Sequence, residues 1–434
     1  MAYRRMRSQL DTYNKGPVLS TSRRASVVIV GAGFAGLAIA QRLANTGFDV
    51  VLLDRNNYHT FQPLIHQVAT AELTPNQIAC PVRRLLRKAQ NVRFQMAEVV
   101  GIDPIGQVVI TQQVQYRYDF LVIATGSRVP LERFSGAKEF GWSIKTIPHA
   151  VALRNQVIRS FEQAAALPEV PSGLLTFIIV GGGATGVELA GALQDWIARS
   201  LVKDYSALSC QDIRVVLLQS GDRLLPGFSS RLQTYTKRHL QKLGVEVRLS
   251  SRVSEVSVNG ITLSDGSSIA SRTVIWTTGV KSDRPKIKTS LPTSELSVLP
   301  TLQLANHCNV YIAGDSIGHL QPKQTWPQLA AAAIQQGKAV SLNLLRQSRG
   351  QSPLPFRYQH RGNMAILSRY AAVVQIGPLE LTGFSAWAIW LVVHIVLLRG
   401  HRTSTLLQWW TSHGRGERSA QTVNHGSNEL FLAK

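Results

Sequence analysis

Cysteine is scarce in this chain, and its scarcity excludes several kinds of chemistry. The 434 residues include only Cys80, Cys210 and Cys308, which lie far apart and form no C-x-x-C pair. This spacing argues against a dithiol redox centre and against a metal site, and it is typical of a reducing compartment. We therefore expect no bound metal, and we expect the three cysteines to be small buried side chains.

Acidic residues are also few. The chain has 25 Asp and Glu against 47 Lys and Arg, which gives a formal net charge of +22. Such a charge predicts an anionic partner, which is a nucleic acid, an acidic membrane surface or a negatively charged cofactor. No basic segment with interleaved aromatic residues appears, so we expect no nucleic-acid binding. The remaining candidates for the anionic partner are an anionic lipid surface and anionic cofactors.

The two ends of the chain lack folding signals. Residues 1–24 are rich in arginine but contain no apolar segment, so they do not fit a secretory signal. We expect a solvated basic tail; a transit peptide is the alternative, which Asp11 weakens. Residues 415–434 are polar, and we expect them to be a disordered tail.

One glycine-rich pattern occurs twice, each time after a β-branched strand and before a helix. In G-x-G-x-x-G the first glycine makes a tight turn, the second admits a pyrophosphate, and the third lets helix and strand pack closely. Helices are expected over 37–46 and 187–199. Two dinucleotide sites in one chain predict a flavoprotein that oxidises a nicotinamide. The glycines are Gly31, Gly33 and Gly36 in the first loop and Gly181, Gly183 and Gly186 in the second.

Polar residues follow the predicted strands. Asp54 ends the strand over 49–53, where a carboxylate would accept hydrogen bonds from an adenosine ribose. Thr125 and Gly126 follow the strand over 119–123, and Asp315 ends a later strand that would complete the flavin site. The corresponding residue of the second nucleotide unit is Gln219.

These positions predict an α/β fold with two Rossmann-like dinucleotide-binding domains, the second inserted in the first, and a C-terminal membrane-anchoring helical segment. The expected divisions are a basic tail over 1–24, an FAD-binding domain over 25–166 and 296–355, an NAD(P)H-binding domain over 167–295, a membrane-associated region over 356–414 and a polar tail over 415–434.

The run from Leu381 to Leu398 is almost uninterruptedly apolar. Its length is at the lower limit for a membrane-spanning helix. A buried core helix, a spanning helix and an in-plane anchor all fit such a run. We favour the in-plane anchor because His394 and Gly383 disfavour spanning, while the basic charge favours anionic lipid.

Several motifs together resemble the type II NAD(P)H:quinone dehydrogenases, which are single-subunit, non-proton-pumping respiratory flavoenzymes. The resemblance covers residues 24–418. It rests on the two glycine loops, the paired glutamines, the Ala124-Thr-Gly126 and Ala313-Gly-Asp315 turns, the Phe61–Ala71 segment and the Ala386–Trp390 segment.

The resemblance implies a non-covalent FAD on the first unit and NADH or NADPH as the substrate bound by the second. Hydride would pass from the nicotinamide to the flavin, and two electrons would then pass to a membrane quinone. It implies a peripheral, monotopic protein on the reducing side of a membrane. Whether the chain forms a homodimer is left open.

Three residues take catalytic roles by this resemblance. Gln335 and Gln336 match glutamines on the quinone side, and the alternative is a helical turn with exposed amides. The family usually has another glutamine four residues earlier, where this chain has Ala331. Glu188 matches an acid near the nicotinamide and flavin, although an acid early in a helix is also favoured by the helix dipole.

Three other functions fit part of the sequence pattern. A sulfide:quinone oxidoreductase needs a cysteine pair beside the flavin, and these cysteines do not supply one. A soluble reductase of a protein electron carrier would leave the run over 381–398 unexplained. A nucleotide-sensing protein would have no use for Asp315 together with the paired glutamines.

The choice between NADH and NADPH is expected to depend on Gln219. A carboxylate at this position would repel the 2′-phosphate of NADPH, whereas a neutral amide does not. Arg223, four residues later, is expected to pair with that phosphate. The alternative is that Gln219 only weakens the binding of NADH and does not favour NADPH. His59 and His66 are expected to be structural.

Overall fold

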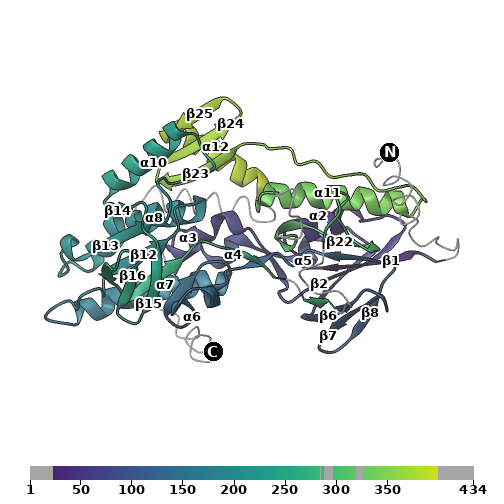
Figure 1. Cartoon of the computed structure of the whole chain (residues 1–434), viewed down its shortest axis with the longest axis horizontal. Coiled ribbons are helices and arrows are strands. Elements are labelled where there is room, and N and C mark those ends of the chain that lie inside the picture. The colour runs from purple at the N-terminus through teal and green to yellow at the C-terminus, as the bar shows by residue number, and fades with distance from the viewer. Residues whose placement is uncertain (1–22, 284, 288–296, 319–325, 399–434) are drawn as a thin grey trace. The chain divides into compact units, whose positions relative to one another are not determined.

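The computed structural model describes residues 23–283, 285–287, 297–318 and 326–398, which form two compact units (Figure 1). Unit 1 contains the described residues of 1–59, 80–128 and 281–360, and unit 2 those of 60–79, 129–280 and 361–434. Each unit is built on a parallel sheet. Most of the expected basic tail and all of the polar tail lie outside the described residues.

The main sheet of unit 1 has six strands. Their order is β21-β22-β9-β1-β2-β5, and all neighbours are parallel except β21 and β22. The central strand β1 has the sequence ASVVIV, and such β-branched strands suit a sheet that is covered on both faces. The strands are β1 (Ala25–Val30), β2 (Phe48–Asp54), β5 (Val92–Met96), β9 (Phe120–Ile123), β21 (Gln303–Leu304) and β22 (His307–Ile312).

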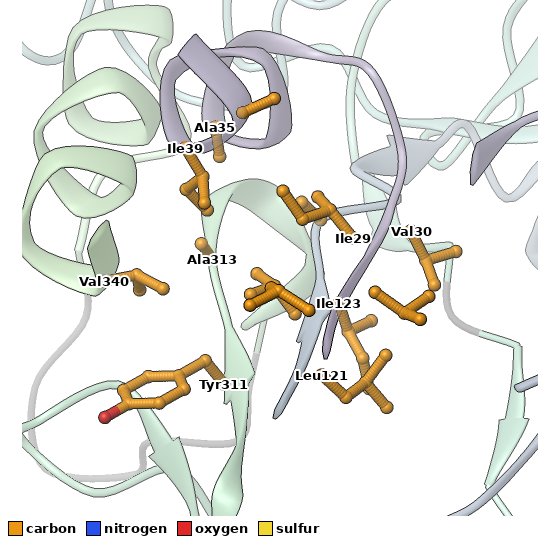
Figure 2. Close-up of a cluster of buried hydrophobic side chains, with 14 of the residues drawn as sticks. Ile29, Val30, Ala35, Ile39, Leu121, Ile123, Tyr311, Ala313 and Val340 are labelled. Atoms are coloured by element: carbon orange, nitrogen blue, oxygen red, sulfur yellow. The ribbon is translucent and has the colours of Figure 1, made fainter. Parts of the chain in front are cut away.

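Two helices of unit 1, α2 (Phe34–Arg42) and α11 (Ala330–Gln347), pack on each other and on this sheet. Their close approach requires Gly337, because a Cβ there would lie 2.7 Å from the carbonyl oxygen of Ala35. Figure 2 shows the shared core, in which apolar side chains from both helices and from three strands gather. They include Ile29, Val30, Ala35, Ile39, Leu121, Ile123, Tyr311, Ala313 and Val340.

The rest of unit 1 consists of short elements. A second sheet has the order β20-β6-β7-β8, and β10 pairs antiparallel with β19. These elements are β6 (Val99–Asp103), β7 (Val108–Thr111), β8 (Gln115–Arg117), β10 (Ser127–Arg128), β19 (Lys281–Ser282), β20 (Lys286–Ile287), α5 (Val82–Leu85) and the 3-10 turn η6 (Gly314–Ser316). Two strands, β3 (Tyr58–Thr60) and β4 (Ala79–Pro81), stand where the chain passes from one unit to the other.

The main sheet of unit 2 repeats this plan. Its order is β11-β18-β12-β13-β14, with every neighbouring pair parallel. In both units the glycine loop follows the central strand, so it lies at the carboxyl edge of the sheet, where the strand order reverses and dinucleotides bind. The strands are β11 (Gly141–Ser143), β12 (Thr176–Val180), β13 (Arg214–Leu218), β14 (Val245–Arg248) and β18 (Thr273–Trp276).

Helices and two small antiparallel sheets complete unit 2. The helices are α3 (Ile65–Ala69), α4 (Pro75–Ile78), α6 (Ala137–Phe140), α7 (Ile147–Ala165), α8 (Ala184–Trp196), α9 (Val202–Asp204), α10 (Ser230–Leu243) and α12 (Gly383–Leu397). The 3-10 turns are η1 (Gln62–Leu64), η2 (Leu131–Arg133) and η4 (Cys210–Asp212), and η3 (Ile197–Leu201) is a π-helical segment. The strands are β15 (Val253–Ser257), β16 (Gly260–Leu263), β17 (Ser268–Ala270), β23 (Asn363–Ser368), β24 (Ala371–Ile376) and β25 (Leu379–Thr382).

The compact units divide the chain differently from the expected domains. Residues 60–79 and 129–166, which we expected in the first domain, belong to unit 2. The reason is packing within that unit, where α7 contacts α3 and β11 pairs with β18 of the main sheet. The α3 helix in turn packs on α8.

Candidate dinucleotide sites

The first glycine loop has the geometry of a phosphate cradle. Gly31 has φ +104°, a conformation that favours glycine, and a Cβ there would overlap the carbonyl oxygen of Ala124. A Cβ at Gly36 would overlap the carbonyl oxygen of Gly31. At Gly33, by contrast, nothing lies within 4 Å of the Cβ position. Two glycines are therefore required by packing, and the third leaves open backbone at the start of α2.

The second loop repeats this arrangement in unit 2. Gly181 has φ +122°, and a Cβ there would overlap the side chain of Thr278. Gly186 is closed in by the carbonyl oxygen of Gly181, whereas nothing lies within 4 Å of a Cβ at Gly183. A Cβ at Gly182 would lie 2.6 Å from Cδ2 of Leu224, so that side chain would have to move to admit a larger residue.

Asp54 and Gln219 hold equivalent positions in the two units. The N–H of Ala32 donates to Oδ2 of Asp54 at 2.7 Å, and the N–H of Gly182 donates to Oε1 of Gln219 at 2.9 Å. Each side chain thus accepts a hydrogen bond from the second residue of its glycine loop. With the Gln219 carbonyl used in this way, its amide NH₂ is the group left to meet a ligand.

Asp54 is poorly solvated. Burial raises the pKa of its carboxyl, while backbone N–H groups of Ala32 and Asn56 and the nearby Arg55 oppose the shift. His59, in β3, contacts the same glycine loop, with Nδ1 2.9 Å from the carbonyl oxygen of Ala32. This contact supports the expectation that His59 is structural.

The turns around Asp315 converge in unit 1. Ser127 donates from Oγ to Oδ2 of Asp315 at 2.6 Å. The N–H of Gly126 donates to Oγ of Ser316 at 2.8 Å, and the hydroxyl of Thr125 lies 3.2 Å from that oxygen. The structure therefore brings Thr125, Gly126 and Asp315 together through two serines that the sequence analysis missed. A serine directly after each of the two turns was the signal available.

The paired glutamines point to different partners. The Gln336 side chain is buried, and its Oε1 accepts the N–H of Gly314 at 2.7 Å. Gln335 bonds twice with the backbone of Gln359, donating to its carbonyl oxygen at 2.9 Å and accepting its N–H at 3.0 Å. The alternative of an exposed helical turn is wrong for Gln336, which instead braces the turn that carries Asp315.

Glu188 is the fifth residue of α8 and lies in an apolar setting. Burial raises the pKa of its carboxyl to about 8, and the N–H of Ile366, which donates to Oε1 at 3.3 Å, opposes the shift. Its Oε2 lies 3.6 Å from Nδ1 of His66, whose side chain is buried. At neutral pH Glu188 is thus mostly a neutral carboxyl group, and its neighbour His66 was not foreseen.

Arg223 forms an ion pair with its neighbour Asp222 at 3.1 Å on the surface of unit 2. Cys80 and Cys308 are free thiols; Cys80 is buried as expected, but Cys308 is only half-buried, so that expectation is wrong for Cys308. No group of residues suited to hold a metal occurs in the described part of the chain.

The α12 helix packs one face on unit 2 and exposes the other. Ala386, Trp387, Trp390 and His394 are buried, whereas Phe384, Val392 and Val396 are 60–65% exposed. Burial lowers the pKa of His394 to about 4, and its Nδ1 lies 2.7 Å from the carbonyl oxygen of Trp390. Among the described residues, no helix has the length and apolar character needed to cross a bilayer.

A family model described as pyridine nucleotide-disulphide oxidoreductase matches residues 25–337 of this chain. The chain is 35% identical over 429 residues to the type II NADH:quinone oxidoreductase Ndh of Mycobacterium tuberculosis. That match covers 94% of this chain and 92% of the relative. It is also 27% identical over 438 residues to the mitochondrial internal alternative NAD(P)H-ubiquinone oxidoreductase A1 of Solanum tuberosum, covering 90% of this chain and 87% of that protein.

The fold is similar to a solved structure of NDH2 from Plasmodium falciparum in complex with NADH. The TM-score is 0.83 with 20% sequence identity, and the likeness covers 92% of this chain and 100% of that one. The sequence matches and the likeness of fold both extend over nearly the whole chain.

Proposed function

Because this chain belongs to the pyridine nucleotide-disulphide oxidoreductase family and, within it, to the type II NADH:quinone oxidoreductases, we propose that it transfers a hydride from NADH or NADPH to FAD and then two electrons to a membrane quinone, without pumping protons. The observation that carries the proposal is the pair of matched glycine loops, each at the carboxyl edge of its own sheet.

FAD is the dinucleotide that we assign to unit 1. The open backbone at Gly33 suits the pyrophosphate, and Asp54 suits the adenosine ribose. Asp315, held by Ser127, suits the ribityl chain. Bound FAD would supply the two-electron chemistry, while these side chains supply binding and position.

NADH or NADPH is assigned to unit 2, with its pyrophosphate at Gly183 and its adenosine ribose at Gln219. The hydrogen bond from Gly182 fixes the Gln219 amide with its NH₂ available, so the residue at this position places no negative charge opposite a 2′-phosphate. We therefore propose that NADPH is used at least comparably to NADH. Arg223 would have to leave Asp222 to reach that phosphate.

Glu188 and the paired glutamines are proposed to serve the reaction in different ways. A carboxyl with a pKa of about 8 is neutral near the working pH, so it can donate a hydrogen bond or release a proton there. Gln336 holds the turn of Asp315, which makes it a positioning residue for the flavin. Gln335 is proposed to lie on the quinone side, although its amide is occupied by Gln359.

Peripheral membrane attachment is proposed to occur through α12, as an in-plane anchor. The support is its exposed face, on which Phe384, Val392 and Val396 repeat at four- and eight-residue spacing without a charge. Burying such a face in the acyl boundary is favourable, and the neighbouring aromatic residues suit the headgroup level.

Steady-state oxidation of NADH and NADPH by the purified full chain, with a panel of short-chain quinones, tests the proposal. We expect repeated turnover of both nicotinamides only when a quinone is supplied. Oxidation that requires a protein electron carrier, with no quinone accepted, would instead favour the reductase alternative.

A further inference from the structure

The α10 helix carries a basic face that the proposed reaction does not use. Its sequence, SRLQTYTKRHLQKL, contains four Lys and Arg and no acidic residue. Leu232 and Leu240 are buried against unit 2, whereas Arg231, Arg238 and Lys242 are exposed. These three residues, spaced seven and four apart, lie on one stripe of the helix, which we term the basic face.

This helix lies beside the start of α12, within the same unit. It runs alongside the β23-β24-β25 sheet (Figure 1). The hydroxyl of Tyr235 lies 3.5 Å from the position of a Cβ on Gly383, the first residue of α12. Nε2 of His239 lies 2.8 Å from Oγ of Ser368, at the end of β23. Tyr235 therefore faces the start of α12 and His239 faces β23, and the basic face lies about 60° around the helix axis from these two residues.

An aromatic cluster occupies the same end of α12. The ring of Tyr370 lies 5.0 Å from that of Trp387 and 6.3 Å from that of Phe384. Tyr370 and Phe384 are both exposed, by 41% and 65%. The same end of unit 2 thus holds three kinds of side chain that are layered at a bilayer surface: exposed apolar residues, aromatic residues and cations.

The charged residues indicate what kind of ligand can bind at this end of unit 2. Arg231 lies 3.9 Å from Glu380 and is 73% exposed on its side chain. Arg238 and Lys242 have no carboxylate within ion-pair distance among the described residues. An exposed apolar face with cations beside one end matches acyl chains below anionic headgroups.

We propose that Arg231, Arg238 and Lys242 form a headgroup site that binds anionic phospholipid while α12 lies in the same bilayer. The site gives the attachment a preference for acidic membranes and fixes which side of unit 2 faces the lipid. The inference rests on the membrane attachment proposed above.

The test is binding of the full flavin-loaded chain to vesicles, either of phosphatidylcholine alone or of phosphatidylcholine mixed with phosphatidylglycerol. The double variant Arg238→Gln/Lys242→Gln removes two charges and leaves the Arg231–Glu380 pair in place. Each basic residue near an acidic surface contributes about fivefold in affinity, so we expect a loss of roughly tenfold or more on the mixed vesicles. Binding to phosphatidylcholine and the oxidation of NADH with a short-chain quinone should not change.

A matched control is Lys203→Gln/Arg272→Gln, which removes two exposed charges from other parts of unit 2. The control should lose much less affinity. Equal losses in both double variants, or no loss in the first, would overturn the headgroup site. So would a change in oligomeric state of the first variant without vesicles, because the face would then join copies of this chain.

The wild type distinguishes this inference from the attachment on which it rests. Equal binding to both kinds of vesicle rejects the headgroup site and leaves the attachment through α12 intact. Binding to neither kind rejects both.

Discussion

Gln219 is a residue at which one substitution tests substrate choice. In Gln219→Glu, one carboxylate oxygen can still accept the N–H of Gly182, so the loop should keep its conformation. The other oxygen places a negative charge opposite the 2′-phosphate of NADPH, which it repels. We expect kcat/KM for NADPH to fall tenfold or more, which is about 1.4 kcal/mol per decade, while NADH is spared.

The control is Gln211→Glu, which adds the same charge at an exposed position before β13. Its kinetics should match those of the wild type. Should the wild type strongly prefer NADH and Gln219→Glu change neither substrate, Gln219 is not the selector.

Glu188 predicts a pH dependence of stability. Its pKa of about 8 in the folded chain lies above the ordinary value of 4.5, so folding favours the protonated form. The stabilisation is fully present below the ordinary value and is lost as the pH rises through about 8.

Glu188→Gln cannot titrate, so its free energy of unfolding should rise relative to that of the wild type as the pH increases from 4.5 to about 8. Denaturant unfolding at a series of pH values measures the difference, and Glu139→Gln, on the surface, should run parallel to wild type. Parallel curves for Glu188→Gln would contradict the assignment.

Asp315 and Ser127 predict a graded loss of FAD. Asp315→Ala should yield colourless protein, because the group proposed to hold the ribityl chain is gone. Ser127→Ala removes one hydrogen bond to a carboxylate, worth about 1.5–3 kcal/mol, and should weaken FAD binding roughly tenfold or more. Ser127→Thr keeps the hydroxyl and serves as the control. Fully flavinated Asp315→Ala would refute the assignment, as would unchanged FAD affinity in Ser127→Ala.

The positions of candidate site residues were predictable where the course of the backbone alone sets them. A glycine loop between a strand and a helix identifies itself by spacing, and a residue that ends a neighbouring strand must lie at the same edge of the sheet. Ser127 and Ser316 were missed because their roles depend on the meeting of two turns that are far apart in sequence. His66 was missed for the same reason, since only packing of α3 on α8 brings it to Glu188.

At the scale of elements, helix starts were misplaced in a consistent way. The helix α2 begins at Phe34 and α8 at Ala184, three residues before the expected starts at Leu37 and Val187. The third glycine of each loop lies inside the first helical turn, where it lets the helix touch the preceding loop. The sequence pattern places this glycine before the helix, because glycine usually destabilises a helix.

The α12 helix carries a prediction about attachment. Val392→Glu/Val396→Glu places two charges on its exposed face, so the fold should persist while membrane attachment is lost. Sedimentation of membranes from expressing cells measures the bound fraction. Deletion from Thr382 onward should likewise release most of the protein, although it also removes the buried Trp387 and Trp390 and exposes the surface on which they pack. Wild-type protein should resist washing with high salt, since burial of apolar area is not screened. Complete release by salt alone would contradict the anchor.

At the scale of the whole molecule, the double Rossmann plan was predictable from the repeated loop. The right-handed crossovers of such units restrict the possible strand orders but do not determine them, so the order of each main sheet comes from the structure. The limits of the compact units were not predictable, because residues 60–79 and 129–166 carry no nucleotide motif. They belong to unit 2 through the packing of α3 on α7 and α8 and through the pairing of β11 with β18, which no local pattern encodes.

The central claim is that one chain carries electrons from NAD(P)H through FAD to a quinone. It is tested most directly by anaerobic titration of the purified full chain, followed by its visible flavin absorbance. We predict that one equivalent of NADH or NADPH bleaches the absorbance and that a short-chain quinone restores it. A yellow protein that NAD(P)H does not bleach, or that stays bleached when quinone is added, would contradict the account.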